Sequence, residues 1–245
     1  MRKINVLSKQ TAQLIAAGEV VERPGSVFKE LLENAIDSGA TQIVAEIKNG
    51  GIKLIKISDN GCGIYKDDVK NAFLRHATSK LKTADDLENI SSLGFRGEAL
   101  ASICAVSKLE IITKSCEEDV GSRFFVNAGV PGEFSEAGCA NGTTIIVRDL
   151  FYNVPARHKF LASDSAEARR IVDIVSRIAL SYVDVKITLI NGARVVFSTK
   201  GKGRILDNII SIYGSDTGRD LLPVEDSSGS FMIKGFISSP ASSLA

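Results

Sequence analysis

The stretch Phe28-Lys29-Glu30-Leu31-Leu32-Glu33-Asn34-Ala35-Ile36-Asp37 carries the strongest fold signal in this 245-residue chain. At about 100° per residue, its polar side chains share an arc of ~100° on a helix. They are Glu30, Glu33, Asn34 and Asp37, and the opposite face is apolar. The pattern predicts a helix with Ser26 as its N-cap, running through Ser38 and ended by Gly39, with one face in a core.

The acidic face of this predicted helix has two readings. A solvated polar face is the ordinary one for an amphipathic helix. Against it, Glu30/Glu33 and Glu33/Asp37 are like-charge neighbours that each cost about 0.2–0.5 kcal/mol, and only Lys29 offsets them. In the second reading, Asn34 offers an amide oxygen to Mg²⁺ beside phosphate oxygens, while a Glu one turn earlier orients a water molecule.

Strands and helices alternate on either side of this segment. Two strands, near 42–48 and 53–58, are joined by the turn signal Asn49-Gly50-Gly51. Helices are predicted near 10–17, 67–73, 85–89, 97–103 and 164–181, and further strands near 109–114, 122–127, 143–149, 185–190 and 194–199. Because the strands have mainly hairpin spacing, the predicted fold class is α+β. The stretch Thr199-Lys200-Gly201-Lys202-Gly203 is the best linker candidate.

A carboxylate follows the second predicted strand, in Asp59-Asn60-Gly61-Cys62-Gly63. A glycine-rich turn is one reading of this segment. In the other, Asp59 accepts a hydrogen bond from the N6 amino group of adenine and meets the O6 acceptor of guanine unfavourably, so it selects adenine. Gly61 and Gly63 would then let the backbone approach a flat base closely.

Two later segments hold groups suited to a triphosphate, although both types are common at surfaces. Thr78, Ser79 and Lys80 provide hydroxyls and a cation. In Gly94-Phe95-Arg96-Gly97, two glycines permit a mobile lid, and a helix is predicted just after Gly97, with free N–H groups able to face phosphates. The alternative reading is a loop leading into a helix.

Composition narrows the class of protein. Hydrophobic residues at 44% and charged residues at 24% are typical of a globular protein, and 30 basic against 29 acidic side chains give a net charge of +1. Four widely spaced cysteines favour reduced thiols over structural zinc. The Walker, Rossmann, H-E-x-x-H and G-x-S-x-G motifs do not occur. With no long apolar run or signal sequence, an intracellular, non-membrane protein is expected.

Taken together and in order, several segments resemble the N-terminal ATPase region of the MutL DNA mismatch-repair proteins. They are Leu14-Ile15-Ala16-Ala17-Gly18-Glu19-Val20-Val21-Glu22-Arg23-Pro24, the Glu30-to-Ala40 helix, Asp59 to Gly63, Arg75 to Lys80, Gly94 to Leu100, and Phe151-Tyr152-Asn153-x-Pro155-Ala156-Arg157. The resemblance runs from residue 4 to about 190 and fades after Gly201. The wider family includes gyrase B, the Hsp90 chaperones and the histidine kinases, and the 16–24 and 94–100 segments single out MutL.

This resemblance implies a fold and a set of site residues. The fold is a two-layer sandwich of helices on a mixed, mostly antiparallel sheet, of the Bergerat type that binds ATP. Glu30 would be the general base, Asn34 the Mg²⁺ ligand, Asp59 the adenine contact, and Thr143 would lie near the base. The other residues implied around the nucleotide are Gly63, Thr78, Ser79, Lys80, Gly94, Phe95, Arg96, Gly97, Glu98, Ala99 and Leu100.

The resemblance also implies partners. ATP would drive homodimerisation through an N-terminal arm, residues 1–24, making a clamp that couples the mismatch-recognition protein MutS to a downstream nuclease or helicase. Weak, non-specific and salt-sensitive DNA binding would use Arg157, Lys159, Arg169, Arg170 and Arg177. The expected location is the bacterial cytoplasm, at the nucleoid, or the nucleus of a eukaryote.

The chain departs from the family in length. Residues 1–200 are predicted to form the ATP-binding domain, and residues 201–245 the beginning of a second, ribosomal-protein-like transducer domain. In the family, that second domain contributes a lysine to the γ-phosphate, and no such motif precedes Ala245. Weak ATP hydrolysis by this chain is therefore expected, and a non-catalytic module that binds nucleotide or partner proteins is the alternative.

Overall fold

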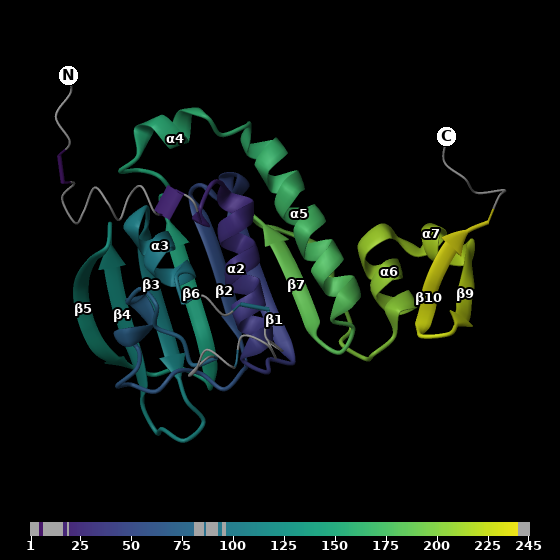
Figure 1. Cartoon of the computed structure of the whole chain (residues 1–245), viewed down its shortest axis with the longest axis horizontal. Coiled ribbons are helices and arrows are strands. Elements are labelled where there is room, and N and C mark those ends of the chain that lie inside the picture. The colour runs from purple at the N-terminus through teal and green to yellow at the C-terminus, as the bar shows by residue number, and fades with distance from the viewer. Residues whose placement is uncertain are drawn as a thin grey trace.

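A mixed sheet of eight strands forms the centre of the molecule (Figure 1). The computed structural model describes residues 5–6, 17–18, 20–80, 86, 93–94 and 97–239. The strand order is β5-β4-β3-β6-β2-β1-β7-β8. The β1 and β7 strands pair in parallel, and the other neighbours are antiparallel. The bounds are β1 (Gln42–Lys48), β2 (Leu54–Asp59), β3 (Lys108–Lys114), β4 (Gly121–Asn127), β5 (Val130–Ala137), β6 (Gly142–Arg148), β7 (Lys186–Asn191) and β8 (Arg194–Ser198).

Helices α2 (Pro24–Asp37), α3 (Ala99–Ala105) and α5 (Asp164–Ser181) lie over one face of this sheet (Figure 1). The short α4 (Pro155–Lys159) leads into α5, and the 3-10 turns η1 (Asn49–Gly51) and η2 (Asn71–Phe73) are connections. The expected α+β sandwich of helices on a mostly antiparallel sheet is therefore confirmed.

Sequence periodicity explains how the two layers meet. Alternate β1 residues Ile43, Ala45 and Ile47 are buried, as strand geometry requires for one covered face. The apolar stripe of α2, including Phe28 and Leu31, is almost fully buried in the same core. Each such large side chain contributes about 1.5–3 kcal/mol to stability. This burial fixes the polar stripe of α2 on the side that faces away from the core.

Some local predictions were wrong. The helix predicted near 67–73 is present only as turns and the 3-10 turn η2, Asn71–Phe73. Helix α2 begins at Pro24 with Arg23 as its N-cap, three residues before the predicted cap Ser26, because the fixed φ of proline suits the first helical position. Strand β5 was not predicted at all, since Pro131 and Gly132 break its strand pattern. Proline is tolerated there because β5 lies at the edge of the sheet.

Other predicted segments lie wholly or partly outside the described residues. The helix near 10–17 is described only at Ala17, and the helix near 85–89 only at Asp86. Of the N-terminal arm, residues 5–6, 17–18 and 20–24 are described. Within it, Ala17 and Val21 are fully buried in the main core, so this part of the arm packs on its own chain.

The chain continues past the main sheet into α6 (Ile205–Tyr213), α7 (Ser215–Arg219) and a hairpin of β9 (Leu221–Ser228) and β10 (Phe231–Ser238). The predicted linker is anchored, because Thr199 is buried and its hydroxyl accepts from the Ile187 amide at 2.8 Å. Asn208 of α6 donates to the Ala179 carbonyl of α5 at 2.8 Å. None of the described helices is long and apolar enough to cross a membrane.

Candidate nucleotide site

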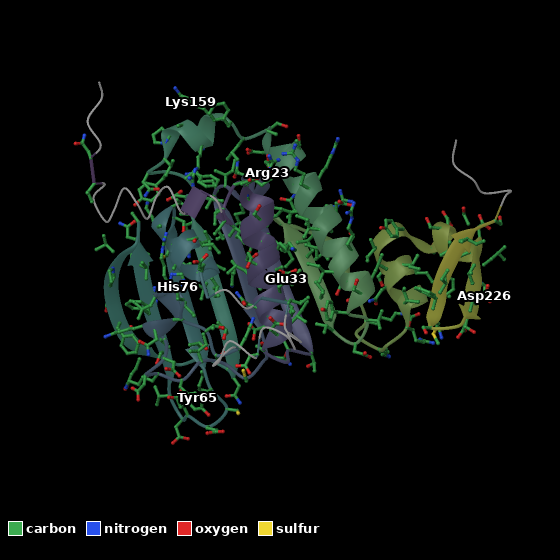
Figure 2. All side chains as sticks on the ribbon, viewed as in Figure 1. Arg23, Glu33, Tyr65, His76, Lys159 and Asp226 are labelled. Carbon is green, nitrogen blue, oxygen red and sulfur yellow. The ribbon has the colours of Figure 1, made fainter. Side chains whose placement is uncertain are left out.

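The polar stripe of α2 forms one wall of the candidate site. Glu30, Glu33, Asn34 and Asp37 are all half-buried on this stripe, as its periodicity predicted. Burial is the main cause that raises the pKa of the Glu33 carboxyl, and the Lys29 ammonium at 3.5 Å opposes it. Figure 2 shows Glu33 midway along the helix and Arg23 at its start. The stripe therefore brings three carboxylates and one amide together.

Glu30 and Asn34 lie one helical turn apart on this wall. Within the described part of the chain, no hydrogen bond or ion pair engages the Glu30 carboxylate. The Asn34 side-chain oxygen accepts a hydrogen bond from Lys80 Nζ at 3.1 Å. A carboxylate open to a water molecule beside an amide oxygen is the arrangement needed to orient that water near a hard cation.

Asp59 is the last residue of β2, and hydrogen-bond donors from three parts of the chain surround its carboxylate. Its Oδ1 accepts from the Gly61 amide at 2.9 Å, the Thr143 amide at 3.2 Å and the Ser38 hydroxyl at 3.4 Å. Burial raises the pKa of this carboxyl, and those same hydrogen bonds oppose the shift. Because no described residue donates to Oδ2, that oxygen is available to an exocyclic amino group.

The structure thus brings together Asp59 and Thr143, which the resemblance implies to lie near the same base, across 84 residues of sequence. The Thr143 side chain is itself fixed by a hydroxyl contact of 3.0 Å with Thr113. Sequence reasoning missed Ser38 and Thr113, which orient these groups. The only available signal for Ser38 was its place directly after the acidic helix.

The glycines of the Asp59 segment are explained by contacts within the protein. Gly63 has a φ of +72°, and a Cβ there would lie 2.1 Å from the Lys114 carbonyl oxygen. A Cβ on Gly61 would lie 1.9 Å from the Ser38 hydroxyl oxygen. Close approach is therefore required at both positions, and the neighbour that requires it is the chain itself.

A second group of donors surrounds the C-terminal end of α2. Lys80 Nζ donates to Asn34 and also forms a short ion pair with Asp37. The Leu93 and Gly94 amides donate to the two carboxylate oxygens of Asp37, at 3.1 and 3.2 Å. Sequence reasoning placed Asp37 on the acidic stripe without giving it a role, so this junction was missed.

The rest of the expected phosphate segment flanks this junction. The Thr78 hydroxyl accepts from the Lys80 amide at 3.1 Å, and Ser79 is exposed. Gly97 has a φ of +62°, and a Cβ there would lie 2.5 Å from the Ala77 carbonyl oxygen. Glu98 is the N-cap of α3, which begins with Ala99 and Leu100 as predicted. Phe95 and Arg96 lie outside the described residues.

The five basic residues expected at DNA differ in their surroundings. Arg170 pairs with the buried Glu167 at 2.6 Å, and Arg177 pairs with Asp173 at 3.0 Å. The Arg157 guanidinium lies against Gly18 of the arm. No ion pair engages Lys159 or Arg169 among the described residues. Lys159 lines a hollow of about 350 Å³ beside α4, and Arg169 lines one of about 600 Å³ between α5 and β8.

This larger hollow is not the candidate nucleotide site. Its lining includes Arg169, Asp173, Arg194 and Val196, and it contains none of the carboxylates of the candidate site, which are Glu30, Glu33, Asp37 and Asp59. The candidate site is instead defined by its chemistry: three hydrogen-bond donors converge on Asp59, and one cation and two amides converge on Asp37.

The fold and this site define a class of ATPase. Residues 22–129 match the family described as histidine kinase-, DNA gyrase B- and HSP90-like ATPase. The chain is 49% identical over 240 residues to the DNA mismatch repair protein MutL of Agathobacter rectalis, an alignment that covers 98% of this chain and 37% of that protein. The chain belongs to the MutL family, and it spans little more than a third of the length of this relative.

Solved structures agree with this assignment. The Aquifex aeolicus MutL ATPase domain complexed with ADP aligns with a TM-score of 0.70 and 29% identity, covering 84% of this chain and 73% of that one. A structure described as the N-terminal domain of a DNA repair protein aligns with a TM-score of 0.74 and 27% identity, covering 93% and 71%.

Proposed function

We propose that this chain binds ATP with Mg²⁺ between α2 and the Asp59 segment and hydrolyses it slowly. The observation that carries the proposal is the environment of Asp59, whose Oδ1 is saturated by three donors while Oδ2 remains for the N6 amino group of adenine. The family relationship and a related domain complexed with ADP give independent support.

The residues of the acidic stripe fit the magnesium ion as well. Mg²⁺ prefers oxygen ligands and keeps several waters, so the Asn34 amide oxygen would hold it together with phosphate oxygens. Lys80, which now bonds that oxygen, would have to turn away from it. The ion would supply charge neutralisation at the phosphates. Glu30, whose carboxylate is not engaged by any described residue, would accept a proton from the attacking water.

The remaining implied residues divide between the two ends of the nucleotide. Asp59, Gly63 and Thr143 would serve the base. Thr78, Ser79, Lys80 and the Gly94–Leu100 segment would serve the phosphates, where positioning and charge stabilisation supply most of the catalysis. Weak hydrolysis is the expected activity of the chain, and the rival function is a module that binds nucleotide or partner proteins without turnover.

We further propose the role of a DNA mismatch-repair clamp. ATP would drive homodimerisation through the arm and couple MutS to a nuclease or helicase, with weak DNA contacts through the five basic residues. Lys159 and Arg169 are the better candidates among these, because the other three already contact Glu167, Asp173 or the arm. Residues 201–245 would begin the second domain, which is supported by Phe231, Met232 and Ile233 being 66–81% exposed on β10.

Calorimetric titration of the chain with ADP and GDP tests the nucleotide proposal. ADP should bind and GDP should not. Asp59→Asn keeps an oxygen for the Gly61 and Thr143 amides but presents an NH₂ group to the adenine amino group. It should weaken ADP binding by about 1–3 kcal/mol, roughly 5- to 150-fold. Equal binding of ADP and GDP, or no loss in the variant, would remove Asp59 from base recognition. A thermal melting curve of Asp59→Asn that matches wild type shows that the loss of binding does not come from unfolding.

A further inference from the structure

Asp37 makes a set of contacts that resembles the environment of a bound anion. Its side chain is 9% exposed and pairs with the Lys80 ammonium. Its two oxygens accept hydrogen bonds from the Leu93 and Gly94 amides at 3.1 and 3.2 Å. One cation and two consecutive backbone N–H groups thus converge on a single carboxylate. The same combination of donors also binds phosphate groups.

Two of these three donors, the Lys80 ammonium and the Gly94 amide, are assigned to phosphate oxygens by the proposed function. Lys80 and Gly94 belong to the segments expected around the triphosphate, and Asn34 of the proposed magnesium site shares the Lys80 ammonium with Asp37. An N–H group that already donates its hydrogen bond to a buried carboxylate cannot donate fully to a second anion. Lys80 in particular is held between two α2 side chains one turn apart.

We propose that Asp37 is a positioning residue that takes the place of a phosphate group, holding Lys80 and the Leu93–Gly94 amides until a nucleotide phosphate displaces it. The inference rests on the proposed function. Asp37 keeps these donors assembled, and its charge competes with the phosphate for them. Nucleotide affinity is therefore lowered at the phosphate end and unaffected at the adenine end, which lies at Asp59 with different partners.

Asp37→Asn tests this competition in the full chain. Asparagine has the same shape and keeps one acceptor oxygen, but it lacks the charge that attracts Lys80. The expected result is ADP binding about tenfold tighter than wild type, with adenosine binding unchanged, both measured by calorimetry at pH 7. The ratio of the two affinities is the informative readout, because a merely structural role would weaken ADP and adenosine together.

Asp173→Asn is the matched control. It removes one negative charge by the same substitution from another helix, α5, where Asp173 pairs with Arg177 at 3.0 Å and lines the hollow beside β8 and not the candidate nucleotide site. ADP affinity in this variant should stay within about twofold of wild type. A carboxylate that does not share Lys80 or the Leu93 and Gly94 amides acts on the phosphates only through its charge, which salt screens near a surface. An equal gain in both variants would mean that general repulsion is responsible, and would overturn the inference.

A measurement on wild type is independent of the folding of Asp37→Asn. The ¹³Cγ resonance of Asp37 reports its hydrogen-bond donors, so ADP should shift it and adenosine should not. An unmoved resonance with saturating ADP contradicts the displacement, as does unchanged or weaker ADP binding in Asp37→Asn. If wild type binds no ADP at all, the proposed function fails and the inference fails with it. If wild type binds ADP without a gain in the variant, only the inference fails.

Discussion

The two ends of the candidate site are held by different kinds of interaction. At the proposed adenine end, Asp59 lies on a strand and receives two backbone amides and a hydroxyl, all close to the central sheet. At the proposed phosphate end, Asp37 lies on the last turn of α2 and receives a lysine side chain and the two amides of Leu93 and Gly94.

The difference indicates which end is preformed. Backbone amides in or beside a sheet cannot move without breaking its hydrogen-bond ladder, so the donors that would hold Asp59 against a base are already assembled. A lysine ammonium on a flexible stem rotates at little cost and exchanges one anion for another. The adenine end should therefore determine which nucleotide binds, and the phosphate end should respond to it.

The largest expected effect is on the rate of ATP hydrolysis, and it should leave nucleotide binding at the phosphate end unchanged. Glu30→Ala should lower the rate of ATP hydrolysis at least about hundredfold, because a general base contributes roughly 10²–10⁴ to the rate. Affinity for a non-hydrolysable ATP analogue should stay near that of wild type. Steady-state phosphate release and calorimetry measure the two quantities. Unchanged hydrolysis would show that Glu30 is not the base, and no hydrolysis in wild type would favour the non-catalytic module.

The next effect tests how strongly the adenine end is built into the fold. Gly63→Ala would force an alanine into a φ of +72° and place its Cβ only 2.1 Å from the Lys114 carbonyl oxygen. The variant should therefore lose about 3 kcal/mol or more of unfolding free energy. Gly39→Ala is its control, because Gly39 has a similar φ of +76° but nothing within 4 Å of the added Cβ.

The control variant should lose only about 1 kcal/mol, which is the cost of the backbone conformation alone. Urea unfolding curves of both variants measure the difference. Equal losses would mean that the Lys114 backbone gives way easily, and that the adenine end is less rigid than its hydrogen bonds indicate.

The smallest effect concerns pH at the same end. Burial raises the pKa of Asp59 above its ordinary value of 3.8, so between 3.8 and the raised pKa the folded chain holds a proton that the unfolded chain has released. The charged carboxylate therefore costs stability above the raised pKa, and this cost disappears as the pH falls through it. Over the same window, loss of the carboxylate charge should weaken ADP binding.

A pH series of unfolding curves and ADP titrations on wild type and Asp59→Asn measures this contribution. The stability of the variant relative to wild type should decrease as the pH falls from 7 towards 4, and its ADP affinity should be less sensitive to pH. A constant difference across this range would contradict the raised pKa.

Sequence periodicity predicted the local parts of both ends. The stripe of α2 followed from the 3.6-residue repeat, and β1, β2 and α5 were found within a residue or two. Strand β5 was missed because an edge strand tolerates residues such as Pro131 that the strand pattern excludes. The N-cap of α2 was misplaced because serine is the commoner cap, whereas here proline at the next position decided the start of the helix.

By itself, the sequence determined that Glu30 and Asn34 share one helical face and that Asp59 ends a strand, because these relations depend only on neighbouring residues and regular backbone geometry. Only the tertiary structure decided that the Thr143 amide supports Asp59 and that Leu93, Gly94 and Lys80 meet at Asp37. Those contacts join segments 43 to 84 residues apart. Their geometry follows from strand order and from the packing of α2 on the sheet, which no local pattern encodes.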